Sequence, residues 1–420
     1  MTDFLDGTVA CLVSLVLNVW IAAVIRSRTA SSEGAFLVRV YWYTLLLRHA
    51  IALFLNAFAG DMRFADAFWG DSSTYDWGGR ILSLQWSGAL YVSPLSSASV
   101  SGFGFTYFVG AVYYVFGQNQ LLVQFLNATL GSLSVVVIFA TARLLFDVGV
   151  ARWAALFMAF FPQMVFWSCA MYKDPAVLLC VALSMYATLR LKSSFSLGYL
   201  ALFLAAVLAL MTLRFYVFYI VVIATLGTFV FSQRRGLVSG LFGQLVMVLA
   251  LLGAMFLGVR GETVRQQQEY LTLERVQVAR ADQANIARSG YGGEIDVSTP
   301  TGALAALPIG LAYMLLAPFP WSASGIRQLL TVPEMLVWYA LLPALARGLR
   351  HTIKERLGPA LPILVFALLL TVSYAVFQSN VGTVYRQRTQ ISMFFFIFMG
   401  HGLELQKKAR AGGPAPGRTP

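Results

Sequence analysis

The chain carries little charge for its length. Only 11% of its 420 residues are charged and 59% are hydrophobic, whereas a soluble domain has about 25% charged residues. The mean hydropathy is +0.73, which excludes an ordinary water-soluble protein. Long apolar stretches recur throughout, each close to the roughly 20 residues that cross a bilayer core. The sequence therefore predicts an all-α polytopic membrane protein, with about 11 spanning helices and additional surface or re-entrant helices.

Cysteine and histidine are also scarce. Cys11, Cys169 and Cys180 lie in or beside apolar segments and lack the spacing of metal ligands, so they are expected to be free, buried thiols. The three histidines are scattered, which argues against a zinc site. We therefore expect no metal and no cofactor. The first apolar run, Gly7–Ile25, lacks a preceding basic region and is expected to be a retained helix and not a cleaved signal peptide.

The net charge of +12 has an explanation in the membrane. The sequence has no aromatic and basic pattern typical of nucleic-acid binding, so no nucleic-acid partner is expected. Cytoplasmic loops of membrane proteins collect Lys and Arg. Arg26, Arg28 and Arg39 thus assign the first turn to the cytoplasm, and the helices on either side place Gly60–Gly102 outside.

The same rule orders the helices that follow. A short aromatic segment, Phe103–Gly117, is predicted to be a helix lying on the outer surface. Spanning helices are then predicted over Leu121–Phe146, Arg152–Met171, Pro175–Leu191, Leu197–Leu213, Phe215–Phe231 and Leu237–Val259. The polar stretch Arg260–Thr301 would be an external loop, which is either a binding loop or lid or a solvated segment without a chemical role.

The C-terminal third needs one helix that does not cross. Basic residues at 347–356 favour the cytoplasm, so Val337–Ala346 is predicted to run inward and Pro359–Phe377 outward. Ala303–Ala317, with three prolines in or after it, is then predicted to be re-entrant or surface-lying. Ile391–Leu405 returns inward, and the tail from Gln406 is expected to be cytoplasmic and disordered.

This topology gathers ionisable residues on the outer face. They are Asp61, Arg63, Asp66, Asp71, Asp76, Arg80, Lys173, Asp174, Arg214, Arg386 and Arg388. A cation at the hydrocarbon boundary is costly unless it has a partner, and a lipid phosphate is a suitable one. Together these residues point to a site for an anionic, lipid-linked substrate.

Each group also has a purely structural interpretation. Asp71 fits a helix N-cap, and Asp76 and Arg80 have the spacing of a surface ion pair. Lys173-Asp174-Pro175 fits the start of a helix, and Arg214 fits a side chain that reaches the membrane interface.

Three motifs carry a family resemblance. "DSSTYDWGGR" places an acid, a tyrosine and an arginine at positions 71, 75 and 80. A longer run, from "FTYFVGAVYYVFG" to "CAMYKDPAVLL", contains a glycine, asparagine, proline and Lys-Asp-Pro skeleton. The chain ends with "RQRTQISMFFFIFMGHGLE". In these motifs the chain resembles integral-membrane glycosyltransferases of the C-type superfamily, which includes protein O-mannosyltransferases and the aminoarabinose transferase acting on lipid A.

The resemblance covers roughly residues 36–260 and the end of the chain, with four departures. Ser72 stands where the family often has a second acid, and "SVSGFG" replaces a proline pair. Gln387 and Gln390 replace the tyrosine and proline of the final motif. The implied organisation is an extra N-terminal helix and turn (1–35), a catalytic core (36–260) with an external loop (60–102), a lid (261–302), a C-terminal membrane region (303–405) and a disordered tail (406–420).

The resemblance implies a polyprenyl-phosphate-linked sugar as donor and a lipid, glycan or protein acceptor. The active site would lie on the external or periplasmic face of a bacterial inner membrane. An inverting transfer needs a carboxylate that takes the proton of the acceptor hydroxyl, and Asp71 is predicted to be this base, with Asp174 orienting or sharing it. Tyr75, Asp76 and Arg80 would position the loop or acceptor. The donor phosphate would bind Lys173, Arg214, Arg386 and Arg388.

Two other functions fit part of the pattern. A polysaccharide polymerase or ligase that uses lipid-diphosphate substrates also needs external arginines. A transporter or flippase for an anionic lipid would carry ionisable groups within its helices and internal repeats. The sequence shows no clear repeat, and apart from Arg48 and His49 its charges gather at helix ends.

Overall fold

The computed structural model describes residues 2–58, 70–90, 103–230, 253, 272–286, 289–322 and 326–411. These residues are almost all helical, and they contain one isolated β-bridge, Gly290–Asn380, and no named strand. The predicted all-α class is confirmed. The predicted helix Leu237–Val259, the charged residues at 61–66 and the tail beyond 411 lie outside the described residues.

The described helices include six that are long and apolar enough to cross a membrane: Leu5–Arg28, Ser31–Ala57, Gln120–Leu145, Asp174–Ser193, Gln328–Glu355 and Leu357–Phe377. Shorter apolar helices cover Phe103–Phe116, Val148–Phe160, Leu197–Leu213, Phe215–Phe229 and Pro300–Leu316. The chain is therefore a helical membrane protein. It divides into two compact units, the first formed by Met1–Val137, Met158–Ala182 and Ala209–Phe215, and the second by the rest.

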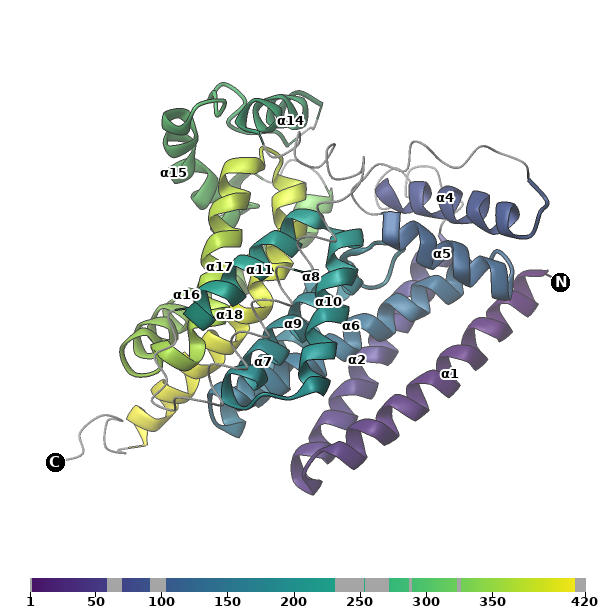
Figure 1. Ribbon diagram of the computed structural model, residues 1–420, viewed down its shortest axis with the longest axis horizontal. Coiled ribbons are helices and arrows are strands. Elements are labelled where there is room, and N and C mark those ends of the chain that lie inside the picture. Colours follow the sequence, from purple (N-terminus) through teal and green to yellow (C-terminus); the bar gives the residue numbers. More distant parts are fainter. Residues whose placement is uncertain are drawn as a thin grey trace. The chain divides into compact units, whose positions relative to one another are not determined.

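The first unit begins with a helical hairpin, α1 (Thr2–Arg28) and α2 (Ser31–Ala57). Next, α4 (Gly70–Trp86) packs along α5 (Phe103–Phe116) (Figure 1). The two backbones approach so closely at Gly79 that a Cβ there would lie 2.4 Å from a methyl carbon of Val109. Glycine is therefore required for this packing. The long helix α6 (Gln120–Leu145) follows.

The predicted continuous helix Arg152–Met171 is wrong. Instead, α7 (Val148–Phe160) ends before Pro162, and a short α8 (Pro162–Phe166) begins with that proline. Proline has no backbone N–H and cannot continue the helical hydrogen bonding, but it is well suited to the first turn of a new helix. The break leaves carbonyl groups of α7 without helical partners.

A fully buried arginine of α2 supplies those partners. Arg48 donates hydrogen bonds to the carbonyl oxygens of Ala159 (3.1 Å) and Met158 (3.4 Å), and to Oγ of Ser168 (2.7 Å). At membrane depth an unpaired backbone carbonyl is costly, so a broken helix is tolerated only where the protein itself satisfies it. Arg48 therefore holds the break in place.

The second unit includes part of α9 (Asp174–Ser193) and of α10 (Leu197–Leu213), together with α11 (Phe215–Val230). After these come α14 (Leu273–Ile286), α15 (Pro300–Leu316), the 3-10 turn Pro320–Ser322, α16 (Ile326–Glu355), α17 (Leu357–Phe377) and α18 (Val381–Arg410). α16 and α18 pack closely where Gly348 and Gly402 meet the carbonyls of the opposite helix.

Two helices of the second unit are longer than predicted. α18 begins at Val381, ahead of the predicted Ile391, and extends into the predicted disordered tail as far as Arg410. The side chain of Asn380 caps its start by accepting the N–H of Gly382 at 2.9 Å, and no proline or glycine pair interrupts the following residues. α16 likewise extends the predicted Val337–Ala346 at both ends and contains Pro333 and Pro343.

The predicted re-entrant or surface-lying segment Ala303–Ala317 corresponds to α15. Ala306 shares a small core with Val276 and Val297, and Phe377 at the end of α17 packs against it. Further along α15, Tyr313 stacks on Tyr291 with ring centroids 3.8 Å apart. α15 thus stays beside α14 and the C-terminal end of α17.

Basic helix ends gather at one end of the second unit. Arg356 donates to the carbonyl of Leu145 (2.8 Å), Lys192 donates to the carbonyl of Gly358 (2.5 Å), and Lys408 pairs with Asp147 (2.9 Å). These basic helix ends therefore contact neighbouring turns of the same unit.

One expectation about cysteine is wrong. Within the described residues all three cysteines are free, but only Cys169 is fully buried. Cys11 is exposed beside Leu12 and Val16 on an apolar face of α1. A face of this kind is suited to contact with lipid, so its thiol needs no protein cover.

Replacing Arg48 with alanine is expected to destabilise the protein by about 3 kcal/mol or more, because backbone carbonyls at the α7–α8 break lose the hydrogen bonds from the guanidinium. Arg39→Ala, an exposed arginine on the same helix, is the matched control. Thermal unfolding in detergent measures both. Equal midpoints for the two variants would show that Arg48 does not hold the break.

Candidate functional site

Tyr113 links α4, in the predicted external loop, to a distant segment of the first unit. Its hydroxyl donates to a carboxylate oxygen of Asp76 at 2.5 Å and lies 3.9 Å from Sδ of Met171. Burial, assisted by the Asp76 carboxylate, raises the pKa of Tyr113 far above its ordinary value, so the phenol stays protonated and remains a donor. α5 thereby joins α4 to the chain that leads into Lys173.

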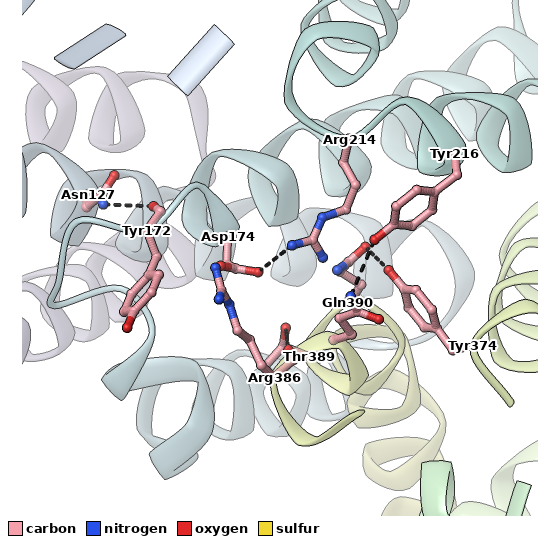
Figure 2. A network of polar contacts seen from close by, with 10 residues as sticks. Asn127, Tyr172, Asp174, Arg214, Tyr216, Tyr374, Arg386, Thr389 and Gln390 are labelled. Carbon is pink, nitrogen blue, oxygen red and sulfur yellow. Dashed lines mark hydrogen bonds and ion pairs between the residues drawn. The ribbon is translucent and has the colours of Figure 1, made fainter. Parts of the chain in front are cut away.

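A side chain of α6 fixes the turn before α9. The buried amide of Asn127 donates to the carbonyl oxygens of Ala170 (2.7 Å) and Tyr172 (2.9 Å), and Figure 2 shows the second of these bonds. Because both bonds hold main-chain groups, Asn127 sets the path of the backbone. The path determines where Lys173 and Asp174 lie.

Asp174 and Arg214 form a buried ion pair. An oxygen of Asp174 lies 3.1 Å from Nη2 of Arg214, with side chains 1% and 5% exposed, as Figure 2 shows. Asp174 is also the first residue of α9, as a helix-start interpretation expects. Lys173 beside it is 9% exposed. The structure thus joins an acid and a cation that the sequence placed in two separate loops.

The remaining predicted residues of α4 divide between two faces. Tyr75 is 9% exposed and meets the ring of Phe105 edge-on at 5.0 Å. Asp71, in the first turn, and Arg80 are exposed. Within the described residues no ion pair joins Asp76 to Arg80, because the carboxylate binds Tyr113 instead.

Ser72 marks the departure from the family pattern. This residue is fully buried. A carboxylate at this buried position would lose its hydration. The environment of α4 therefore suits a small serine, and one acid in the first turn, Asp71, faces outward.

The two arginines of α18 have different environments. Arg388 is fully buried and donates to the carbonyl oxygen of Ala317 at 2.6 Å and of Leu315 at 3.4 Å. Its guanidinium also lies 5.0 Å from the ring centre of Trp338. A phosphate could reach it only after these contacts broke, so Arg388 serves as a cap for α15. Arg386 is partly exposed.

Polar residues that the sequence analysis did not select lie on the same helix. Gln387 donates to the hydroxyl of Tyr216 (3.4 Å), and Gln390 accepts from the hydroxyl of Tyr374 (3.0 Å). The tyrosine rings meet edge-on with centroids 6.0 Å apart. Gln387 and Gln390 were visible as departures from the final motif, but the opposing tyrosines come from α11 and α17 and required the fold.

Tyr385 of α18 makes another contact that was not predicted from the sequence. Its hydroxyl donates to a carboxylate oxygen of Glu334 at 2.5 Å, and the Glu334 residue is 4% exposed. The carboxylate lies on α16, which the sequence analysis predicted only in part. No signal in the sequence connected these residues.

The described part of the predicted lid is firmly attached. Arg280 of α14 is 1% exposed and donates to the carbonyl oxygens of Val376 (2.5 Å), Gln378 (3.1 Å) and Gly292 (3.1 Å). Ser379 returns a hydrogen bond to the Arg280 carbonyl at 2.6 Å. These bonds make α14 a fixed cover over the α17–α18 turn. The earlier part of the predicted lid, residues 260–271, lies outside the described residues.

Residues 101–257 match the family model of dolichyl-phosphate-mannose-protein mannosyltransferases. The predicted resemblance to C-type glycosyltransferases is confirmed. The matching segment contains Lys173, Asp174 and Arg214, whereas α4 and α18 lie outside it. The segment that matches the family model therefore carries the buried ion pair but neither Asp71 nor Arg386.

Among solved structures, the chain is similar to the apo form of the Archaeoglobus fulgidus oligosaccharyltransferase, with 12% identical residues and a TM-score of 0.48. The match covers 90% of this chain and 53% of the archaeal one, so this chain spans about half the length of that protein. Similarity at that level supports no statement about chemistry. No curated protein sequence matches the chain.

Replacing Tyr113 with phenylalanine is expected to loosen α4, because a hydrogen bond to a charged group contributes about 1.5–3 kcal/mol. Tyr114→Phe is the matched control, since that neighbour is 55% exposed. Hydrogen exchange of the α4 amides is the measurement. Tyr113→Phe should speed exchange there and Tyr114→Phe should not. Unchanged exchange in Tyr113→Phe would contradict the predicted link.

Proposed function

We propose that the chain is a membrane glycosyltransferase that moves a sugar from a polyprenyl-phosphate donor to a hydroxyl acceptor. The observation that carries the proposal is the buried Asp174–Arg214 pair, with Lys173 beside it, inside the segment that matches the mannosyltransferase family. Positive groups held in place before the reaction stabilise charge that develops on a leaving phosphate.

The proposed reaction is a displacement at the anomeric carbon. The acceptor oxygen forms a bond to this carbon while the bond to the phosphate oxygen breaks, and the acceptor proton passes to a carboxylate. Asp71 is the proposed base, because it is exposed in the first turn of α4. Asp174 is engaged by Arg214, so its proposed role is to orient that arginine.

The departing group is polyprenyl phosphate. Lys173 and Arg214 are the proposed phosphate-binding residues of the first unit, and Arg386 is the proposed one of the second. Tyr75 packs α4 onto α5, so its proposed role is to position the loop, and Arg80 is left as the exposed candidate for acceptor contact. The proposal places donor and acceptor at the external or periplasmic face of a bacterial inner membrane, with a lipid, glycan or protein as acceptor.

The buried charges of the second unit and of α2 argue against the transporter alternative. Arg48 and Arg388 bind backbone carbonyls, and Glu334 binds Tyr385. Ionisable groups that serve a translocation path line a cavity or pair with one another. These three groups instead stabilise helix ends and contacts between helices.

Parallel assays separate the three functions. Purified protein in lipid nanodiscs is given either a radiolabelled sugar on polyprenyl monophosphate or an oligosaccharide on polyprenyl diphosphate, with membrane-fraction acceptors. Label leaving the monophosphate lipid alone supports the proposal. Release from the diphosphate lipid alone supports a polymerase or ligase. Movement of intact lipid across vesicles without release supports a flippase, and either of these last results contradicts the proposal.

Asp71→Asn is expected to lower kcat by about 10²–10⁴-fold, because an amide cannot take the acceptor proton. Asp296→Asn, which alters an exposed acid on the other unit, is the control and should retain full activity. Rates measured with saturating donor make the comparison. Full activity in purified Asp71→Asn would exclude Asp71 as the base.

A further inference from the structure

The cluster formed by Tyr216, Tyr374, Gln387 and Gln390 leaves hydrogen-bonding capacity unused. Gln390 is 1% exposed, and its Nε2 has no hydrogen-bond partner among the described residues. Gln387 is 8% exposed, and its Oε1 has none either. A buried donor and a buried acceptor without partners are costly to the folded protein, so an occupant that binds both would lower that cost.

The geometry of the cluster specifies what those atoms offer. Gln390 accepts from Tyr374 and therefore turns its N–H groups away from that tyrosine, while Gln387 donates to Tyr216 and keeps its carbonyl oxygen. The two tyrosine rings, 6.0 Å apart and edge-on, fix the two hydroxyls. Figure 2 shows Tyr216 and Tyr374 beside Gln390. One free donor and one free acceptor match a sugar hydroxyl, which accepts and donates at once.

The two glutamines of the cluster lie on α18, the helix that also carries Arg386, a proposed phosphate-binding residue. Arg386 precedes Gln387 directly, and Gln390 follows Arg386 at a spacing of four residues, which places both on one face of α18. In a lipid-phosphate sugar one oxygen joins the ring to the phosphorus. Residues that read the sugar must therefore lie within about one helical turn, ~5.4 Å, of a residue that binds the phosphate.

We propose that Gln387 and Gln390, held by Tyr216 and Tyr374, bind hydroxyl groups of the donor sugar and determine which sugar the protein accepts. This inference rests on the proposed function. It gives the two departures from the family's final motif a role, because a tyrosine or proline in their place would not offer a carboxamide to the sugar.

The test compares binding of a short-chain polyprenyl phosphate with binding of the same lipid carrying mannose, glucose or arabinose. The full-length protein is used in nanodiscs, and thermal shift gives the apparent affinity for each lipid. In the wild-type protein at least one sugar should strengthen binding over the bare lipid phosphate. Gln390→Leu should weaken binding of that sugar lipid by about tenfold and leave binding of the bare lipid phosphate unchanged.

Gln378→Leu is the matched control, because Gln378 is also a buried glutamine of the second unit and also has an unpartnered Oε1, but lies at the α17–α18 turn. The Gln378→Leu protein should still bind the sugar-carrying lipid more tightly than the bare lipid phosphate. A second variant, Gln387→Leu, should reduce the gain in affinity that the sugar gives over the bare lipid phosphate. It should also change the order of preference among the three sugars. A purely structural cluster would instead lower the unfolding temperature and weaken both lipids equally.

The outcomes separate failure of this inference from failure of the proposed function. If the wild-type protein binds lipid phosphate and transfers sugar, and Gln390→Leu keeps both the full strengthening and the sugar preference, the inference is overturned alone. It is also overturned if no sugar strengthens binding of the lipid phosphate. If the wild-type protein binds none of the lipids and transfers none of the sugars, the proposed function fails and the inference fails with it.

Discussion

The need to satisfy backbone carbonyls at interrupted helices governs much of this structure. A helix ends with carbonyl groups that have no partner within the helix, and in a membrane protein no water is at hand to bind them in the hydrocarbon region. Arg48, Arg280 and Arg388 each meet this need with a fully buried guanidinium. They donate to carbonyls at the ends of α7, α17 and α15, respectively. The negative end of each helix dipole also favours a cation there.

These caps determine where the candidate site can lie within each unit. Arg48 holds the α7–α8 break, and this break lets the chain turn before α9. Asn127 then fixes the turn that carries Lys173 and Asp174. In the second unit, Arg280 and Arg388 fasten α14 and α15 around the start of α18. The start of α18 carries Arg386. Of the arginines that the sequence predicted to bind the donor, Arg388 therefore builds the fold.

The sequence predicts the helices well where an apolar run ends at a strong polar boundary. α10 occupies the predicted Leu197–Leu213 without a shift, because serines precede it and Arg214 follows it. Pro162 indicates the α7–α8 break in the sequence. The prediction nevertheless followed the apolar run, which continues past this proline. The start of α18 was missed because Gln, Arg and Thr residues resemble a loop when their tertiary partners are unknown.

The candidate site was predictable only in part, for a similar reason. The topology rule brought Asp174 and Arg214 to the same face, but their ion pair depends on the packing of α9 against the α10–α11 turn. Arg386 and Arg388 are two residues apart in a motif and looked equivalent. On a helix that spacing turns them to different sides, and the structure buries Arg388 under α15 while Arg386 stays partly exposed. Tyr216 and Tyr374 have no local signal at all.

The central claim is that the cations beside Asp174 receive the phosphate of a lipid-linked donor. The most direct measurement is an experimental density map of the protein in nanodiscs with a non-hydrolysable polyprenyl-phosphate sugar. The account predicts that phosphate density lies within about 4 Å of the side-chain nitrogen atoms of Lys173 or Arg214, which is the distance of an ion pair. Phosphate bound instead at the basic end of the second unit, near Arg350 and Lys354, would contradict it.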